Sequence, residues 1–286
     1  MTSLLQISHL QLPDGAQLAY TVLAPSFTPT ATILCFNGAF CNLYQYIFFA
    51  QELVKAGVQC ILHDCRGVGQ SIPANRSNLQ FTFDQYIEDA EVLLNHLNIS
   101  QVVTIGMAWG SRPAILFGTK SKLSTGVALF DFSMGVSVSS EHRSAQIAGT
   151  KLSYHSRIRK GIVEPSFLKP VVIEPRKHRH VKNCARAMAA TSKAPFDTSE
   201  SFAAAVGLDE CTVKVLLATG EYDINLIAEG GTKEVFERLQ GGRSETELCV
   251  LDNCGHGSIM ARPILCSQVV LEWMTRMGLC NVVSKQ

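Results

Sequence analysis

The residues that could do chemistry in this chain stand where predicted strands end. A segment framed by glycines, Gly106 to Gly110, follows an apolar run over 102–105, and its middle residue is Ala108. Asp223 and His256 follow two later predicted strands. An aspartate can orient a histidine, and that histidine can then take the proton of a hydroxyl nucleophile. The residue types and their order therefore predict an acyl-transfer site, although position 108 carries no hydroxyl.

Alternating strands and helices are predicted to position these residues. Continuous apolar runs of five to seven residues indicate buried strands, and apolar spacings of three and four indicate helices. An alternating pattern around Pro13-Asp14-Gly15 indicates a hairpin. Thr82 and Gln85 have the spacing of a capping box. The hairpin covers 4–23, the strands 31–36, 58–62, 102–105, 126–132, 212–218 and 247–251, and the helices 43–56, 83–97, 228–240 and 262–277.

This alternation predicts an α/β fold. The fold would have a mostly parallel sheet, an N-terminal hairpin and helices on both faces. Residues 1–135 and 211–286 are expected to form the core, and 136–210 a helical cap inserted into it. Functional residues of such sheets lie at the carboxyl ends of the strands. The segment around Ala108 should therefore lie close to Asp223 and His256, at the carboxyl edge of the sheet.

Over nearly its whole length the chain resembles the α/β-hydrolase superfamily. Gly106 to Gly110 corresponds to that family's Gly-x-Ser-x-Gly nucleophile elbow, with Ala108 in place of the serine. Residues 64–71 resemble its Asp-x-Arg-Gly-x-Gly-x-Ser turn. The resemblance implies that Asp223 and His256 complete a triad. It also implies that the backbone N–H groups of Ala39 and Trp109 form the oxyanion hole.

Two points stay open at the level of the sequence. Asp131 also follows a predicted strand, and some hydrolases take the acid from that position, so it rivals Asp223; we favour Asp223. Ala108 is either an engineered replacement of serine or the natural residue of a non-hydrolytic relative. The intact Asp223 and His256 favour the first explanation. Ser111 is no substitute, because it falls about one helical turn beyond the elbow.

The predicted cap suggests an anionic partner. Residues 136–193 carry 12 Lys or Arg and 3 Glu, a net +9, which leaves −8 for the rest of a chain whose net charge is +1. Arg176, Lys177 and Arg179 are the candidate contacts with an acyl-carrier protein or coenzyme A. Alternatively, these charges only keep the cap solvated.

A finer resemblance points to a kind of acyl substrate. Asn37 before the Gly38-Ala39 loop, together with Trp109, resembles the hydroxyacyl-carrier-protein acyltransferases of rhamnolipid and polyhydroxyalkanoate synthesis. By this resemblance Asn37 and Phe40 would contact a 3-hydroxyacyl substrate. The alternatives are an ester or lactone hydrolase of a small apolar substrate, and a non-hydrolytic protein that binds a ligand or guides a rearrangement.

Other function classes fit less well. A haloalkane dehalogenase needs aspartate at position 108, and so does an epoxide hydrolase unless Ala108 replaced that aspartate. The ten cysteines form no Cys-x-x-Cys pair, so we expect no metal site and no cofactor. A net charge of +1 gives no support to nucleic-acid binding. Without a visible signal peptide or an apolar span, we expect a cytoplasmic protein of unassigned oligomeric state.

Overall fold

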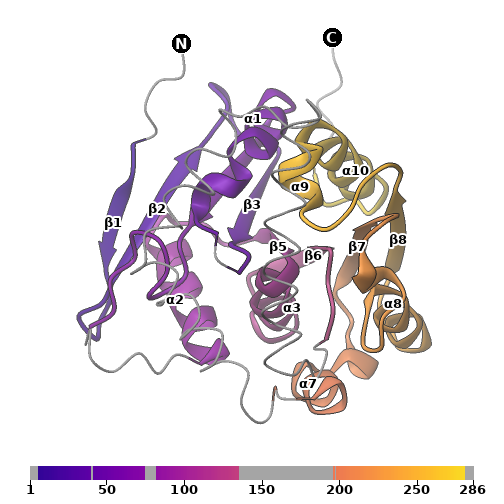
Figure 1. Cartoon of the computed structure of the whole chain (residues 1–286). Coiled ribbons are helices and arrows are strands. Elements are labelled where there is room, and N and C mark those ends of the chain that lie inside the picture. Colours follow the sequence, from indigo (N-terminus) through magenta and orange to yellow (C-terminus); the bar gives the residue numbers. More distant parts are fainter. Residues whose placement is uncertain (1–5, 40, 75–81, 135–195, 197, 281–286) are drawn as a thin grey trace, which may run out of the picture.

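One eight-stranded sheet forms the centre of the molecule (Figure 1). The structure, a computed structural model, describes residues 6–39, 41–74, 82–134, 196 and 198–280. The strand order is β1-β2-β4-β3-β5-β6-β7-β8; β1–β2 and β2–β4 are antiparallel and all later neighbours are parallel. The strands are β1 (Ser8–Gln11), β2 (Gln17–Leu23), β3 (Ala31–Phe36), β4 (Val58–His63), β5 (Val102–Met107), β6 (Ser124–Phe130), β7 (Lys214–Gly220) and β8 (Thr246–Leu251).

Helices cover both faces of the sheet. Side chains of α1, α9 and α10 pack in the core on one face, and those of α2, α3, α7 and α8 pack in the core on the other. Among the described residues, no helix combines the length and the apolar character needed to cross a bilayer. The helices are α1 (Ile47–Lys55), α2 (Phe83–His96), α3 (Ser111–Lys120), α7 (Ser199–Val206), α8 (Thr232–Gly241), α9 (Ser258–Ala261) and α10 (Pro263–Arg276). Short 3₁₀ turns are η1 (Leu43–Tyr46), η2 (Ala108–Gly110), η4 (Leu208–Glu210) and η5 (Ile224–Leu226).

The predicted fold class is confirmed. Strand β3 shows why an apolar run becomes a central strand: Ile33 and Cys35 enter the core on the α1 face, while Leu34 and Phe36 enter the core on the α2 face. A strand whose two faces are both covered by helices must be apolar at every position. The predicted capping box is also present, because Thr82 and Gln85 satisfy each other's backbone N–H at the start of α2.

Most of the predicted cap lies outside the described residues. The described part of 136–210 comprises Phe196 and residues 198–210, which include α7 and η4. Phe202 of α7 lies under the guanidinium of Arg112 on α3, 5.3 Å from it, and joins the same core as the α2 side chains. The division into a core and a cap at residues 136 and 210 stays a prediction.

The last residue of β4, His63, is a buried histidine that should make the protein less stable in acid. His63 is 1% exposed and its ring packs edge-on against Phe36, with 5.0 Å between the ring centroids. Burial lowers the pKa of His63 to about 4. Between about pH 6.5 and 4, His63 is therefore protonated in the unfolded chain but neutral in the folded chain. The free energy of unfolding falls as pH falls through this range.

Replacing this histidine by phenylalanine should flatten that acid limb. His63→Phe keeps a buried ring but cannot titrate. We expect urea unfolding at pH 7 and pH 4.5 to show about 2 kcal/mol less acid destabilisation than in the parent protein. Equal acid losses in the two proteins would mean that His63 is not the group responsible.

Candidate active site

The turn after β5 holds Ala108 in a strained conformation. Ala108 has φ of +52°, in the left-handed region that a side chain with a Cβ rarely adopts. That conformation costs an alanine about 1 kcal/mol. Strand β5 ends at Met107 and α3 begins at Ser111, so the chain turns from strand to helix within three residues. Residue 108 sits half-exposed at the point of this turn.

Two glycines permit the turn. A Cβ on Gly106 would lie 2.3 Å from the carbonyl oxygen of Gly110. A Cβ on Gly110 would lie 2.4 Å from the carbonyl oxygen of Phe36, at the end of β3. Both contacts are with backbone atoms, which cannot move aside as a flexible side chain can. The glycine frame therefore lets the elbow close on itself and against the loop after β3.

Substituting the second glycine should destabilise the protein. Gly110→Ala forces the elbow away from Phe36, and we expect the free energy of unfolding to fall by about 1–3 kcal/mol. Gly241→Ala at the end of α8 is the matched control, because nothing lies within 4 Å of its added Cβ. That control should be neutral or up to about 1 kcal/mol stabilising. Denaturant unfolding of both variants gives the two changes in the free energy of unfolding. Equal changes would refute the close contact between residue 110 and the Phe36 carbonyl oxygen.

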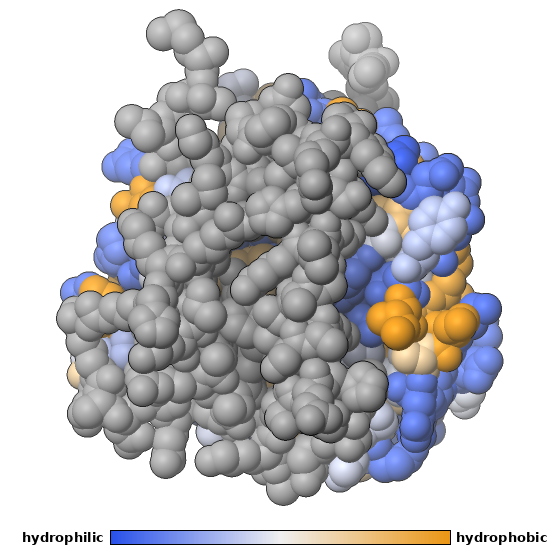
Figure 2. All heavy atoms as spheres, in the orientation of Figure 1, coloured by the Kyte–Doolittle hydropathy of each residue, from blue (hydrophilic) through white to orange (hydrophobic). Residues whose placement is uncertain are grey.

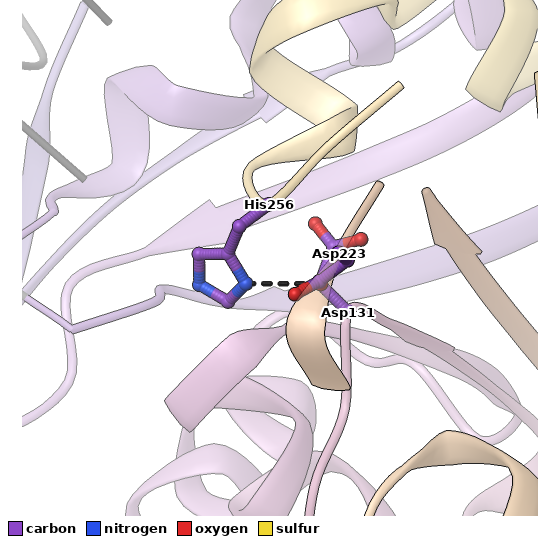
Figure 3. Close-up of side chains that lie close together, drawn as sticks. All are labelled: Asp131, Asp223 and His256. Atoms are coloured by element: carbon purple, nitrogen blue, oxygen red, sulfur yellow. Dashed lines mark hydrogen bonds and ion pairs between the residues drawn. The ribbon is translucent and has the colours of Figure 1, made fainter. Parts of the chain in front are cut away.

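Asp223 and His256 are brought together by β7 and by the loop between β8 and α9. Their side chains are joined by a hydrogen bond of 3.0 Å between Nδ1 of His256 and Oδ2 of Asp223 (Figure 3). The Asp223 side chain is fully buried, and its Oδ1 accepts the backbone N–H of Asn225 at 3.0 Å. The His256 ring keeps 32% exposure, and its other nitrogen points away from both carboxylates. That nitrogen lies on the opposite side of the ring from Asp223.

The loop after β3 lies against the elbow. A Cβ on Gly38 would come within 3.0 Å of the carbonyl oxygen of Met107, the residue before Ala108. Outside the helices and strands of the described residues, the backbone N–H groups of Ala39 and Trp109 make no backbone hydrogen bond. Two backbone donors on adjoining loops are the chemical requirement of an oxyanion hole.

Comparison with known families supports the fold assignment. A model described as the alpha/beta hydrolase fold matches residues 31–120, from β3 through the elbow to the end of α3. The chain has the α/β-hydrolase fold.

Individual relatives are distant. The chain is 25% identical over 116 residues to a proline iminopeptidase from Lactobacillus delbrueckii subsp. bulgaricus; the match covers 40% of this chain and only 39% of that protein. The enol-lactonase from Burkholderia xenovorans superposes with a TM-score of 0.69 at 16% identity, covering 94% of this chain and 100% of the other. The thioesterase domain from the curacin biosynthetic pathway gives 0.71 at 12% identity over 94% and 100%. At these identities the two structures establish the α/β-hydrolase fold alone.

The two candidate acids have different surroundings in this fold. Asp131 is fully buried, and its Oδ2 accepts the backbone N–H groups of Gly257 at 2.8 Å and Ser258 at 2.7 Å. Its Oδ1 accepts the N–H of Gly220 at 3.3 Å. Asp223, by contrast, is bonded to the His256 ring itself, with 3.0 Å between its Oδ2 and Nδ1. Burial raises the pKa of Asp131 to about 6, with the charge of His256 opposing that rise.

The Asn37 side chain, a predicted substrate contact, is bonded to backbone. It is fully buried, and its Oδ1 accepts the backbone N–H of Cys65 at 2.9 Å. Its Nδ2 donates to the carbonyl oxygens of Cys41 at 3.1 Å and Gly38 at 3.4 Å. Both the oxygen and the nitrogen of the Asn37 amide are thus bonded to backbone atoms. We assign Asn37 to holding the loop after β3, because its contacts span both ends of that loop.

Sequence reasoning missed a second support of this loop. Gln45 in η1 is buried, and its Oε1 accepts the backbone N–H of Gly38 at 3.2 Å. Nothing in the sequence distinguishes this glutamine from a surface residue of a helix. Ser111 fits its prediction, since its hydroxyl is buried and donates to the carbonyl oxygen of Phe130. The predicted substrate contacts Phe40, Arg176, Lys177 and Arg179 lie outside the described residues.

The outer side of the acid-bearing segment is apolar. Tyr222, Ile224 and Ile227 are 67%, 70% and 76% exposed, whereas Asp223 between them is buried. Figure 2 shows apolar surface gathered on the β7–β8 side of this face of the molecule. The chain therefore turns the carboxylate inward toward His256 and the large apolar side chains outward.

Three side chains of the site also meet a geometric condition for holding a metal ion. Asp131, Asp223 and His256 each place one possible ligand atom within 4.8 Å of the other two. The Asp131 oxygens already accept backbone N–H groups, and Nδ1 of His256 already pairs with Asp223. A metal ion would have to displace these bonds, so hydrogen bonding accounts for the cluster.

Proposed function

We propose that this α/β-hydrolase scaffold serves acyl transfer or the hydrolysis of esters or thioesters, with a serine at position 108 as the nucleophile. The observation that carries the proposal is the 3.0 Å hydrogen bond between Asp223 and His256, in a fold whose elbow keeps its strained turn. An aspartate that is fully buried on one side of a half-exposed imidazole is suited to hold one tautomer of the ring.

The proposed chemistry follows from these positions. His256 would take the proton of the serine hydroxyl through the ring nitrogen that faces away from Asp223. The serine oxygen would attack the acyl carbonyl, and the N–H groups of Ala39 and Trp109 would stabilise the resulting oxyanion, each worth about 3–4 kcal/mol. His256 would then protonate the leaving alcohol or thiol. Water, or an acceptor alcohol or thiol, would finally release the acyl group.

The chain as it stands cannot form an acyl-enzyme, because alanine has no nucleophilic atom. Two features favour a lost serine over an unrelated alanine. Ala108 keeps a φ of +52° that costs energy and gives an alanine no advantage. The buried Asp223 carboxylate and its bond to His256 also remain, although a binding protein has no use for them.

The acyl substrate is proposed to be a 3-hydroxyacyl group carried by an acyl-carrier protein or coenzyme A in the cytoplasm. The net +9 of residues 136–193 supports this reading, since both carriers are anionic. The thioesterase domain from the curacin pathway is among the folds that superpose well. A runner-up is a hydrolase of small esters or lactones.

A substrate panel on the Ala108→Ser variant tests the proposal. The panel comprises a 3-hydroxyacyl thioester of coenzyme A, an unsubstituted acyl thioester, a p-nitrophenyl ester and an N-terminal prolyl amide. We expect the thioesters to be turned over with the highest kcat/KM. Preference for the ester would favour the runner-up. Cleavage of the prolyl amide alone would instead align the chain with the iminopeptidases, and inactivity on all four would refute the proposal.

A second function is favoured by one observation, which is Ala108 itself. A natural alanine would make the chain a ligand-binding or rearrangement protein, with His256 at most an acid or base. Calorimetry with the thioesters on the unaltered protein addresses this candidate. Tight binding by the unaltered protein, with no turnover after Ala108→Ser, would select it.

A further inference from the structure

Asp131 joins the histidine loop to the central sheet. Its backbone leaves β6 with φ of +52°, and its Oδ2 accepts the N–H groups of Gly257 at 2.8 Å and Ser258 at 2.7 Å. Those are the two residues that directly follow His256. A buried carboxylate that accepts two short N–H bonds fixes both peptide groups, because an unpaired buried donor is costly. The position of His256 on the sheet therefore depends on Asp131.

The same residue also joins the acid-bearing loop. Its Oδ1 accepts the N–H of Gly220 at 3.3 Å, three residues before Asp223. Its carbonyl oxygen accepts Nδ2 of Asn225 at 3.0 Å, and the backbone N–H of Asn225 bonds Oδ1 of Asp223 at 3.0 Å. Asp131 is thus bonded on both sides of Asp223 and immediately after His256.

We infer that Asp131 is a positioning residue that clamps the acid loop to the histidine loop and places a second buried negative charge beside His256. The inference rests on the proposed function for its catalytic consequence, but its structural part stands without it. Asp223 supplies the hydrogen bond, and Asp131 supplies geometry and charge. Orienting the His256 ring and fixing the loop that carries it are therefore done by two different carboxylates.

The charge effect follows from distance. Possible ligand atoms of Asp131, Asp223 and His256 lie within 4.8 Å of one another (Figure 3). An opposite charge within about 4–6 Å favours the charged form of a group, so an ionised Asp131 stabilises the imidazolium. Among the described residues, the thiol of Cys266 on α10 also lies near Asp131, and Cys254 lies beside Cys266. Burial raises the pKa of Cys266 well above its usual range, so that thiol adds no charge near neutral pH.

The test begins with the protein as it stands. Carbon-13 NMR of the His256 imidazole gives its pKa in the parent and in Asp131→Asn, which can keep one oxygen for the two loop N–H groups. We expect that pKa to fall by about one pH unit or more in Asp131→Asn. The matched control is Asp252→Asn, an exposed carboxylate four residues before His256 in the same loop, which should change it by less than about 0.3. Equal shifts would overturn the inference.

A second measurement protects the test against misfolding. In the parent, the Asp131 carboxyl and the His256 ring should titrate as a coupled pair. The chemical shift of each group's carbon should therefore change in two steps, at its own pKa and at that of the other group. Independent single-step curves would contradict the proximity of the charges. This titration uses the unsubstituted protein. It therefore tests whether the Asp131 and His256 charges interact even if Asp131→Asn does not fold.

The catalytic consequence is read in the Ala108→Ser background. Adding Asp131→Asn should lower kcat about 10-fold or more and move the acid limb of its pH profile to lower pH, with KM little changed. A purely structural role would lower the amount of active protein without moving that limb. If Ala108→Ser is itself inactive, the proposed function fails, while the NMR titrations still decide the role of Asp131.

Discussion

Replacing Ala108 by serine should raise kcat/KM on activated esters or thioesters by about 10⁴- to 10⁶-fold over the unaltered protein. The gain is large because the other parts of the site are in place. The turn at position 108 keeps φ of +52°, and Asp223 holds the His256 ring at 3.0 Å. A single hydroxyl would complete a nucleophile, base and acid that act as a unit, and effects of such units are far from additive.

Steady-state assays with purified variants measure this gain. Adding His256→Ala to Ala108→Ser should remove nearly all of it, because the serine would have no base. Adding Ser111→Ala instead should leave the gain in place, since that hydroxyl is buried and donates to the carbonyl oxygen of Phe130. A correctly folded Ala108→Ser protein without activity would show that the site is not organised for acyl transfer.

Removing the Arg66 guanidinium should lower the free energy of unfolding by about 3–5 kcal/mol. Arg66 donates to both carboxylate oxygens of Asp89 on α2, at 2.9 and 2.6 Å, and also pairs with Asp14 in the turn between β1 and β2. The Arg66 and Asp89 side chains are 9% and 5% exposed. Arg66→Ala therefore leaves a buried carboxylate without its counter-charge.

An exposed pair of similar geometry provides the control. Arg276 donates to both oxygens of Glu247, at 3.2 and 2.6 Å, but its side chain is 53% exposed. Because water screens that pair, Arg276→Ala should cost no more than about 1 kcal/mol. Guanidinium unfolding at pH 7 compares the two variants. A double change of Arg66 to Met and Asp89 to Leu should recover most of the loss, and failure to recover it would point to packing instead of charge.

The fold class and the positions of the candidate groups could be read from local patterns. Apolar runs of strand length arise from burial between two helical layers, so β3 to β7 were predictable, whereas the edge strand β8 is mostly half-exposed. The glycines at 106 and 110 mark the tight turn in the sequence, and the structure shows their reason, since the elbow lies against the end of β3 and the start of α3. The order of Ala108, Asp223 and His256 along the chain, together with the parallel sheet, predicts that they meet at one edge.

Which of these groups bond one another was settled only by tertiary structure. Asp131 and Asp223 both follow strands, yet only the fold shows the ring of His256 bonded to Asp223 and the two residues after it bonded to Asp131. The amide of Asn37 likewise turned inward, toward Cys65 and the loop it supports. These contacts join residues from 4 to 127 positions apart. Whether a hydrogen bond forms depends on differences of a few tenths of an ångström in the distance between donor and acceptor. Sequence patterns of residue type and spacing do not specify positions that finely.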